Sequence, residues 1–257
     1  MTGSSMSADA ALEALAARIA RLGEDWGAHR VGIADLTAPD VAAAVCSQGG
    51  EWLASFPRAV SVAFRLQDAI VDRLPLEHRH ALVAKTYGFH IYTAINQHLD
   101  QTATVIAGIL QEAGHAAVPV PTSLSVETGG YCGPLSHKLA ARAAGHGWIG
   151  RSCLLITPTV GPRVRFVTVL TDAPLPAGTP MERDCRACTE CVDACPAGAF
   201  TGRAFDPNEP IEARMDVRAC TAYRAASKVW SGTDICGVCV AVCPHGRRGG
   251  AASTGKN

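Results

Sequence analysis

The spacing of the cysteines near the C-terminal end constrains this chain more than any other feature. Eight of its 11 cysteines lie between Cys185 and Cys243. The segment CRACTECVDACP has the C-x2-C-x2-C-x3-C-P spacing typical of a bacterial-type iron–sulfur site. The later segment CGVCVAVCP repeats the last three positions, and Thr233 stands where the first cysteine would be. A threonine supplies no thiolate, so Cys220 is the expected replacement.

We expect the two segments to share their ligands between two clusters. In two-cluster ferredoxins the fourth cysteine of such a run ligates the other cluster, because it points away from the first three. This rule predicts one [4Fe–4S] cluster on Cys185, Cys188, Cys191 and Cys243. It predicts a second cluster on Cys195, Cys220, Cys236 and Cys239.

Zinc and disulfides are the two other uses of clustered cysteines. Structural zinc sites use pairs of cysteines two to four residues apart rather than a run of this kind. Disulfides need an oxidising compartment, and an odd total of 11 cysteines fits poorly with complete pairing. The spacing therefore favours iron–sulfur clusters. Cys46, Cys132 and Cys153 lie outside both segments and are expected to be small buried side chains.

Length and charge limit the remaining possibilities. The 257 residues carry 23 basic and 23 acidic side chains, so the formal net charge is zero. This balance gives no support for strong nonspecific binding to nucleic acid, although a small specific contact with tRNA stays open. There is no apolar run long enough to span a bilayer and no signal-peptide pattern at the N-terminus. We therefore expect a cytoplasmic protein with no membrane contact.

Residue patterns predict a mixed α/β region before the cysteines. Helices are expected at 7–22, 52–56, within 82–112 and at 135–144, and strands near 31–35 and at 59–66, 116–120, 152–157 and 163–171. The last two strands are expected to form a hairpin through Gly161 and Pro162. The buried stripe of the long helix is expected to comprise Ile91, Ile95, Leu99, Val105, Ile106 and Leu110. The predicted domains are residues 1–175 and 176–245, with a flexible tail at 246–257.

The segment Gly145-His146-Gly147-Trp148-Ile149-Gly150 matches G-x-G-x-x-G, but its context is wrong for a dinucleotide site. That motif must follow a strand and open a helix. Here the predicted order is reversed, with a helix before and a strand after. The glycines indicate a backbone that approaches a large or flat group, or a tight helix-to-strand turn.

The run GPLSHKLAARAAGHGWIGRSCLLI, followed by the proline-rich linker and both cysteine segments, resembles epoxyqueuosine reductase. The resemblance extends roughly from Arg30 to Pro244. It implies an α+β fold, with a nitroreductase-like corrinoid-binding α/β domain followed by a two-cluster ferredoxin-like domain. It also implies that two [4Fe–4S] clusters pass electrons to a cobalamin near the turn formed by Gly147–Gly150, which we call the GWIG turn. The residues that would contact this cofactor are Tyr131, Cys132, Gly133, Trp148, Gly150 and Leu155.

Tyr131 is the candidate catalytic residue. When Gly133 and Pro134 are aligned with the family pattern, Tyr131 stands in place of the aspartate that donates a proton in that family. A tyrosine can donate a proton to a substrate that is being reduced. Its more ordinary role is that of a packed aromatic side chain with a satisfied hydroxyl.

Three functions are compatible with these features. The first is a cobalamin-dependent iron–sulfur reductase that acts on a substrate of its own, which the residues do not identify. The second is an electron-transfer protein that reduces a corrinoid or a partner, which the missing aspartate favours. The third is a cobalamin carrier or sensor. The first two need an external electron donor, such as a ferredoxin or flavodoxin.

Overall fold

The computed structural model describes residues 7–45, 49–126 and 133–247. Contacts divide the chain into two compact units that interleave in sequence. Unit 1 is assembled from residues 1–64, 97–146 and 166–180, and unit 2 from residues 65–96, 147–165 and 181–257. The predicted domains are consecutive in sequence instead, and whether residues 1–175 fold alone stays a prediction.

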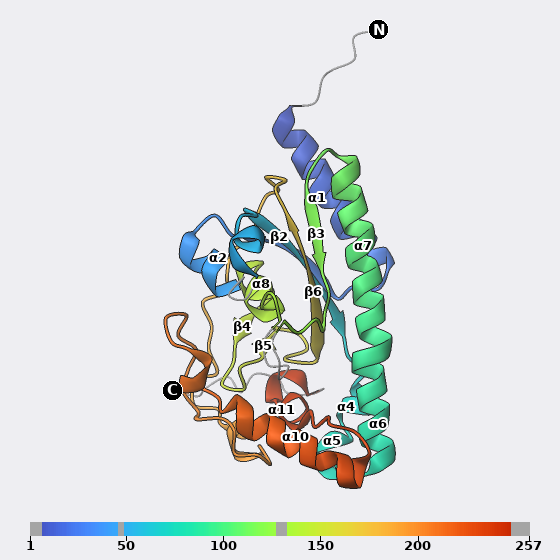
Figure 1. Cartoon of the computed structure of the whole chain (residues 1–257), viewed down its shortest axis with the longest axis vertical. Coiled ribbons are helices and arrows are strands. Elements are labelled where there is room, and N and C mark those ends of the chain that lie inside the picture. Colours follow the sequence, from blue (N-terminus) through green and yellow to red (C-terminus); the bar gives the residue numbers. More distant parts are fainter. Residues whose placement is uncertain (1–6, 46–48, 127–132, 248–257) are drawn as a thin grey trace, which may run out of the picture. The chain divides into compact units, whose positions relative to one another are not determined.

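A four-stranded sheet organises unit 1 (Figure 1). Its order is β1 (Arg30–Asp35), β2 (Arg58–Arg65), β6 (Val164–Thr171) and β3 (Ala117–Val120). β1 pairs antiparallel with β2, and β3 pairs antiparallel with β6. The two inner strands are buried along nearly their whole length, so both faces of the sheet are covered. β3 is an edge strand, which explains how it accommodates Pro119.

Helices cover the sheet of unit 1 on both faces. α1 (Ala8–Asp25) packs where Val31 of β1 faces Gly23, and α8 (His137–Ala143) lies where the next residue, Gly32, faces Ala144. Successive strand residues point to opposite faces, so these helices lie on opposite sides. A serine caps the start of each helix, since Ser7 accepts from the backbone of α1 and Ser136 from that of α8. α2 (Pro39–Val45) and α3 (Gly50–Ala54) complete this unit together with α7 (Asn96–Glu112).

The long helical region predicted within 82–112 is present, but it is interrupted. It comprises α6 (Ala81–Phe89), a π-helical segment at His90–Ile95 and α7. The prediction that Val105 is buried was wrong, because this residue is 36% exposed while Ile106 is fully buried. Leu99, Ile106 and Leu110 lie on one side of α7, whereas Val105 lies about 100° around the helix from Ile106. Gly114, with φ of +89°, ends the region as expected.

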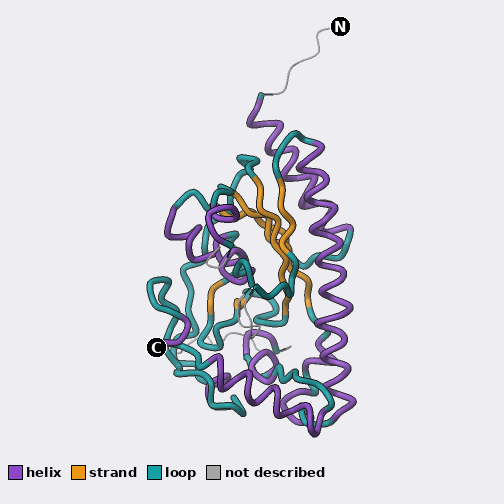
Figure 2. The backbone as a smooth tube through the Cα atoms, in the orientation of Figure 1, coloured by secondary structure: helices purple, strands orange, loops and turns teal. Residues whose placement is uncertain are grey.

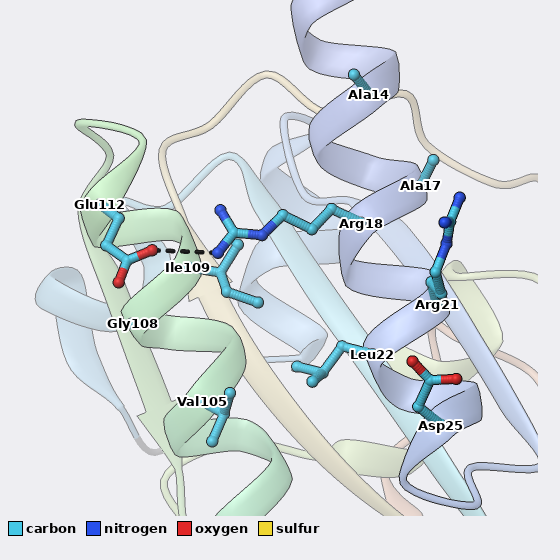
Figure 3. A pocket seen from close by; sticks show the side chains of 10 residues that line it. All are labelled: Ala14, Ala17, Arg18, Arg21, Leu22, Asp25, Val105, Gly108, Ile109 and Glu112. Atoms are coloured by element: carbon cyan, nitrogen blue, oxygen red, sulfur yellow. Dashed lines mark hydrogen bonds and ion pairs between the residues drawn. The ribbon is translucent and has the colours of Figure 1, made fainter.

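Val105 lines a shallow hollow between α1 and α7 in unit 1 (Figure 3). Small and aliphatic side chains form much of its surface, and Arg18 of α1 pairs with Glu112 of α7 across it at 3.2 Å. None of the predicted site residues that the structure describes lines this hollow.

The hairpin predicted for residues 152–171 was wrong. β5 (Leu155–Ile156) pairs with β4 (Trp148–Ile149) in a separate two-stranded sheet, and β6 enters the four-stranded sheet instead. Thr157 and Gly161 bridge a tight turn, and Gly161 has φ of +57°. An alternating pattern identifies a strand but not its partner, and the strand expected at 152–157 is also shorter than predicted, since it comprises only Leu155–Ile156.

Unit 2 contains helices, most of them short, the small sheet of β4 and β5, and long loops (Figure 2). Besides α6 and the π-helical segment, it contains α4 (Asp68–Val71), α5 (Leu74–Glu77), α9 (Glu190–Asp193), α10 (Val217–Ser231), α11 (Val238–Ala241) and 3-10 turns at Ile211–Ala213 and Pro244–Gly246. Its main apolar cluster comprises Leu66, Val71, Leu74, Tyr87, Ile91 and Ala241. The mixed helix and sheet composition predicted from the sequence is confirmed. No helix within the described ranges is both long and apolar enough to cross a bilayer.

Candidate metal centre

The first cysteine segment contains α9 and bends tightly before this helix. Cys185 and Cys188 precede this helix and are joined by a backbone hydrogen bond from Cys188 N to Cys185 O of 3.0 Å. Cys191 lies within the helix and Cys195 follows it. Arg186, between the first two cysteines, has φ of +48°, which a non-glycine residue rarely adopts. This tight curl is the backbone shape that the two-residue gaps require.

The second segment surrounds α11. Cys236 lies just before this helix, Cys239 within it, and Cys243 caps the turn at Pro244–Gly246. Gly237 opens α11 with φ of +80°. Cys220 comes from a different element, the first turns of α10.

The eight thiols form two groups. Cys243 interacts electrostatically with Cys185, Cys188 and Cys191, although it is distant from them in sequence. Cys239 interacts most strongly with Cys236, then with Cys220 and Cys195, and least with Cys191. We call the first set group A (Cys185, Cys188, Cys191, Cys243) and the second group B (Cys195, Cys220, Cys236, Cys239). Their memberships are those expected for crossed ligation, and the binding of iron by each group stays a prediction.

The chemistry of both groups fits a bound cationic centre. Burial, reinforced by neighbouring thiols, raises the pKa of Cys191 to about 11. Burial raises the pKa of Cys243 to about 12 and that of Cys239 further. Thiols so placed do not ionise at neutral pH by themselves, whereas coordination to a metal deprotonates a thiol outright. Within the part of the chain that the structure describes, no three His, Cys, Asp or Glu side chains are close enough to hold a single metal ion.

Hydrogen bonds aimed at sulfur accompany both groups. In group B, Ala199 N donates to Cys195 Sγ at 3.4 Å, and the backbone of Val238 donates to Cys236. In group A, the Ser152 hydroxyl donates to Cys191 and the backbone of His245 donates to Cys243. Such bonds stabilise thiolates and tune the reduction potentials of iron–sulfur clusters.

Group A lies against the GWIG turn within unit 2. Trp148 and Ile156 form an apolar cluster with Cys243, and the Trp148 ring meets His245 edge-on at 5.1 Å. A Cβ added at Gly150 would lie 3.2 Å from Cys185 Sγ. The glycine therefore permits close approach of the turn to this sulfur.

Trp148 also carries an unsatisfied donor. Its Nε1 is buried and has no hydrogen-bond partner among the described residues. A buried N–H without a partner costs about 1–3 kcal/mol. A polar group of a cofactor bound at this turn would satisfy it, which is the observation that fits a further group beside group A.

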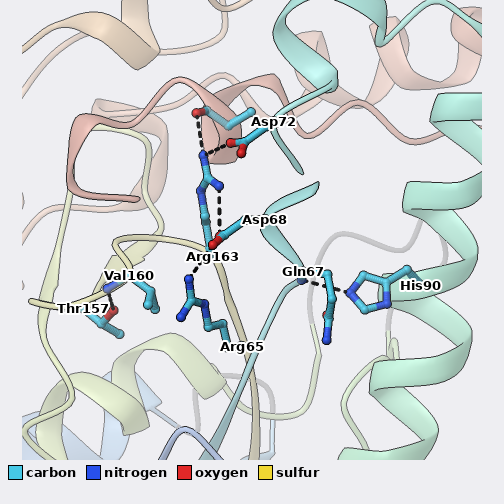
Figure 4. A network of polar contacts seen from close by, with 9 residues as sticks. Arg65, Gln67, Asp68, Asp72, His90, Thr157, Val160 and Arg163 are labelled. Atoms are coloured by element: carbon cyan, nitrogen blue, oxygen red, sulfur yellow. Dashed lines mark hydrogen bonds and ion pairs between the residues drawn. The ribbon is translucent and has the colours of Figure 1, made fainter. Parts of the chain in front are cut away.

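An ion-pair network supports the turn that carries Cys243 (Figure 4). Arg163 is 1% exposed and pairs with Asp68 at 3.0 Å and with Asp72 at 2.6 Å. Its guanidinium also reaches Ala241 O at 3.5 Å, within α11. A Cβ at Gly246 would lie 2.9 Å from Arg163 Nε. The arginine thus contacts the backbone both before and after Cys243, at Ala241 and Gly246. Sequence reasoning missed this role, because Arg163 resembles any polar residue that begins a strand.

Tyr87 is a second residue whose position the sequence did not reveal. It is buried in α6, and a Cβ at Gly237 would lie 2.7 Å from its hydroxyl oxygen. Burial raises its pKa well above the usual range, and the charges of Cys239 and Cys236 contribute. The hydroxyl therefore remains a protonated donor beside group B.

The structure describes some of the remaining predicted site residues and not others. Tyr131, Cys132 and Cys46 lie outside the described residues. Gly133 is half-buried, whereas Trp148, Gly150 and Leu155 are buried by protein. Cys153 is buried, as expected. Contacts of these positions with cobalamin, and the catalytic role of Tyr131, stay predictions.

His146, within the glycine-rich motif, has a structural role in unit 1. Its Nε2 is 3.1 Å from Ser61 O, and Arg30 Nε donates to its Nδ1 at 3.3 Å. Burial lowers its pKa to about 4. The ring is therefore neutral, with Nε2 as donor, and the motif serves as the turn that follows α8.

Known proteins resemble this chain in its cysteine segments and in its fold. Residues 184–246 match the family described as a 4Fe-4S double cluster binding domain. Epoxyqueuosine reductase of Bacillus anthracis is 32% identical over 116 residues, which cover 45% of this chain and 30% of that protein. The enzyme of Gloeobacter violaceus is 41% identical over 91 residues, which cover 35% of this chain and 26% of that protein. The matched region is thus less than a third of the length of these relatives.

Solved structures share the fold over most of the chain. A reductive dehalogenase structure, described in connection with B12-dependent dehalogenation, aligns over 90% of this chain and 31% of its own, with a TM-score of 0.68 and 22% identity. Epoxyqueuosine reductase from Streptococcus thermophilus aligns over 90% of this chain and 66% of its own, with a TM-score of 0.56 and 16% identity. The predicted resemblance to epoxyqueuosine reductase and the predicted fold class are confirmed.

Proposed function

We propose that this chain is an iron–sulfur, cobalamin-dependent reductase that resembles epoxyqueuosine reductase. The observation that carries the proposal is the placement of group A against the GWIG turn, with group B adjoining it through α9 and α11. Two four-thiol groups in series suit the transfer of electrons toward that turn. The relatives named above, which include a protein described as B12-dependent, support a corrinoid as the acceptor.

The roles of the chain's own residues follow from their positions. Groups A and B would each hold a [4Fe–4S] cluster, and the hydrogen bonds to their sulfurs would tune the potentials. Trp148 would donate its indole N–H to a polar group at the turn, and Tyr131 would donate a proton to the substrate. When bound, the cobalamin would supply the low-valent cobalt chemistry of the reduction.

Cobalamin binding tests the proposal directly. Protein reconstituted with iron and sulfide without oxygen is expected to bind cobalamin at micromolar concentration and to show a cob(II)alamin spectrum after mild reduction. Metal analysis should give about eight irons per chain. Failure to bind cobalamin in protein that carries both clusters would contradict the proposal.

The first substrate to test is an epoxyqueuosine-modified tRNA stem loop, because one structural relative was solved with such a molecule. The balanced charge of the chain predicts weak nonspecific affinity for tRNA. Binding of modified and unmodified stem loops at several salt concentrations separates specific from nonspecific contact. We also place the reaction in the cytoplasm, where thiols stay reduced.

An electron-transfer protein without its own substrate is the second candidate. It is favoured by one observation, the tyrosine that replaces the family's aspartate at position 131. Replacing Tyr131 by Phe separates the two functions. Substrate turnover should fall sharply in a reductase, while the rate of cofactor reduction should stay the same in both cases.

A further inference from the structure

An exposed apolar face lies on α6 and the end of α10 in unit 2. Leu82 and Phe89 of α6 are 69% and 66% exposed, and Val229 and Trp230 of α10 are 91% and 37% exposed. Leu82 and Phe89 are seven residues apart and so share one side of their helix. The two helices pack against each other, so these four residues lie on neighbouring helices. Exposed aromatic and aliphatic residues in such numbers mark an interaction surface.

Basic side chains surround this face. The Arg79 guanidinium lies over the Trp230 ring at 5.6 Å, and the Lys85 side chain lies beside Gly232, which ends α10. Residues 73–92 and 216–234 together contain six Lys and Arg against three Asp and Glu, in a chain whose net charge is zero. The rim therefore favours a partner with an acidic surface.

The face lies close to group B. Cys220 belongs to α10 itself. On the opposite, buried side of α6, Tyr87 contacts Gly237, between Cys236 and Cys239. A helix is about 10 Å across, so a single helix separates the surface from these sulfurs. Group A instead lies at the GWIG turn.

We propose that the α6–α10 face docks a small acidic electron-carrier protein, which delivers electrons to group B. This inference rests on the proposed function only in that group B must hold a redox-active cluster. Three features agree with it: an apolar centre, a basic rim and a position one helix away from group B, whereas group A lies at the GWIG turn.

The surface around α9 is the competing entry point. A shallow hollow there is lined by Ala187, Cys188, Thr189, Glu190, Asp193 and Ala194. Its charged residues are acidic and it lacks large apolar side chains, so it would suit a basic carrier and would deliver electrons to group A. The sign of the charge therefore distinguishes the two surfaces.

The test is the rate at which reduced flavodoxin, an acidic protein, reduces the clusters in stopped-flow mixing without oxygen. An acidic plant-type ferredoxin serves as a second probe. In the variant Lys85→Glu, the second-order rate constant at low salt is expected to fall about 5- to 10-fold, and less at high salt. Val229→Glu, at a residue whose side chain is almost fully exposed, should give a similar loss of the rate constant. Reduction by dithionite and the iron content should stay unchanged in both variants.

Glu190→Lys is the matched control on the α9 surface, and it is expected to leave the flavodoxin rate unchanged. A rate that responds to Glu190→Lys but not to Lys85→Glu would overturn the proposal. So would the failure of both carriers to reduce protein that dithionite reduces normally. Neither cobalamin nor substrate is present in this assay, so its result is independent of the cobalamin-binding test of the proposed function.

Discussion

Strand β2 and helix α10 are held in place by different forces. Six consecutive residues of β2 are buried, and most of them are apolar. Each buried valine or phenylalanine contributes about 1.5–3 kcal/mol. α10 has 15 residues, of which only Ser227 and Ser231 are buried, and α9 has no buried residue. The sheet of unit 1 is therefore stabilised by hydrophobic burial, whereas α9 and α10 lack that contribution.

Polar contacts hold α10 instead, and ligation of Cys220 is predicted to add to them. Asp216 caps its start, and Ser227 and Ser231 both donate to the carbonyl oxygen of Thr233 at 2.8 Å. Each such bond contributes only about 0.5–1.5 kcal/mol net. The larger stabilisation must come from Cys220, if it is bound to a cluster. The comparison therefore predicts that α9 and α10 depend on bound iron for their structure, and that the sheet does not.

Removal of iron is the largest expected perturbation. Structural metals contribute on the order of 10 kcal/mol to small sites. Chelation without oxygen should therefore increase amide exchange in α9 and α10 by about 100-fold or more, while β2 changes by less than about 2-fold. Hydrogen–deuterium exchange with mass spectrometry measures both in one sample. Equal acceleration in β2 would contradict the comparison, because it would mean that both regions unfold together.

Paired cysteine variants test the grouping inside the iron-dependent region. Cys195→Ser with Cys220→Ser removes two ligands of group B and should leave about four of roughly eight irons. Cys195→Ser with Cys191→Ser removes one ligand from each group and should leave almost none. Iron content and EPR spectra of the reduced protein measure the outcome. If the ligands were not crossed, the second pair would spare one cluster and the first would damage both.

Group membership was predictable from the sequence for a physical reason. Short gaps between ligands determine which sulfurs converge, and Cys220 was the one cysteine in the region available for the vacant position. The position of β6 was not predictable, because strand pairing depends on contacts between distant segments. Arg163 and Tyr87 were missed for the same reason, since their partners come from α4, α11 and Gly237. The predicted burial of Val105 was wrong because the predicted stripe included two adjacent residues, and adjacent residues lie about 100° apart around a helix.

A change of pH should act on the hydrophobic region through His146. Its pKa is about 4 in the folded protein against 6.5 for the free side chain, mainly because the ring is buried. Between these values the unfolded chain binds the proton more readily, so the stability contributed by the neutral ring is complete above pH 6.5 and is lost as the pH falls toward 4. The loss should be on the order of 3 kcal/mol.

Urea unfolding of the wild type and of His146→Gln, followed by circular dichroism, measures this effect. Both proteins contain the same cysteines, so the difference between them isolates the histidine. The free energy of unfolding of the wild type should decrease more steeply than that of the variant from pH 7 to pH 5. Parallel slopes would show that His146 does not gain a proton on unfolding.

The smallest expected effect concerns Tyr87. Its substitution should affect only one of the two cysteine groups. Its hydroxyl lies beside group B, and burial keeps it protonated by raising its pKa well above the usual range. A donor near a cluster stabilises the more negative reduced state, so Tyr87→Phe should lower the potential of that cluster. A net hydrogen bond of about 0.5–1.5 kcal/mol corresponds to roughly 20–60 mV. The potential of the group A cluster should not change, because the cysteines that act on Tyr87 are Cys239 and Cys236 of group B. EPR-monitored redox titration resolves the two, and Tyr92→Phe, at an exposed tyrosine of the π-helical segment, is the matched control. An equal shift at both clusters would mean that the substitution disturbs packing of the unit rather than one sulfur environment.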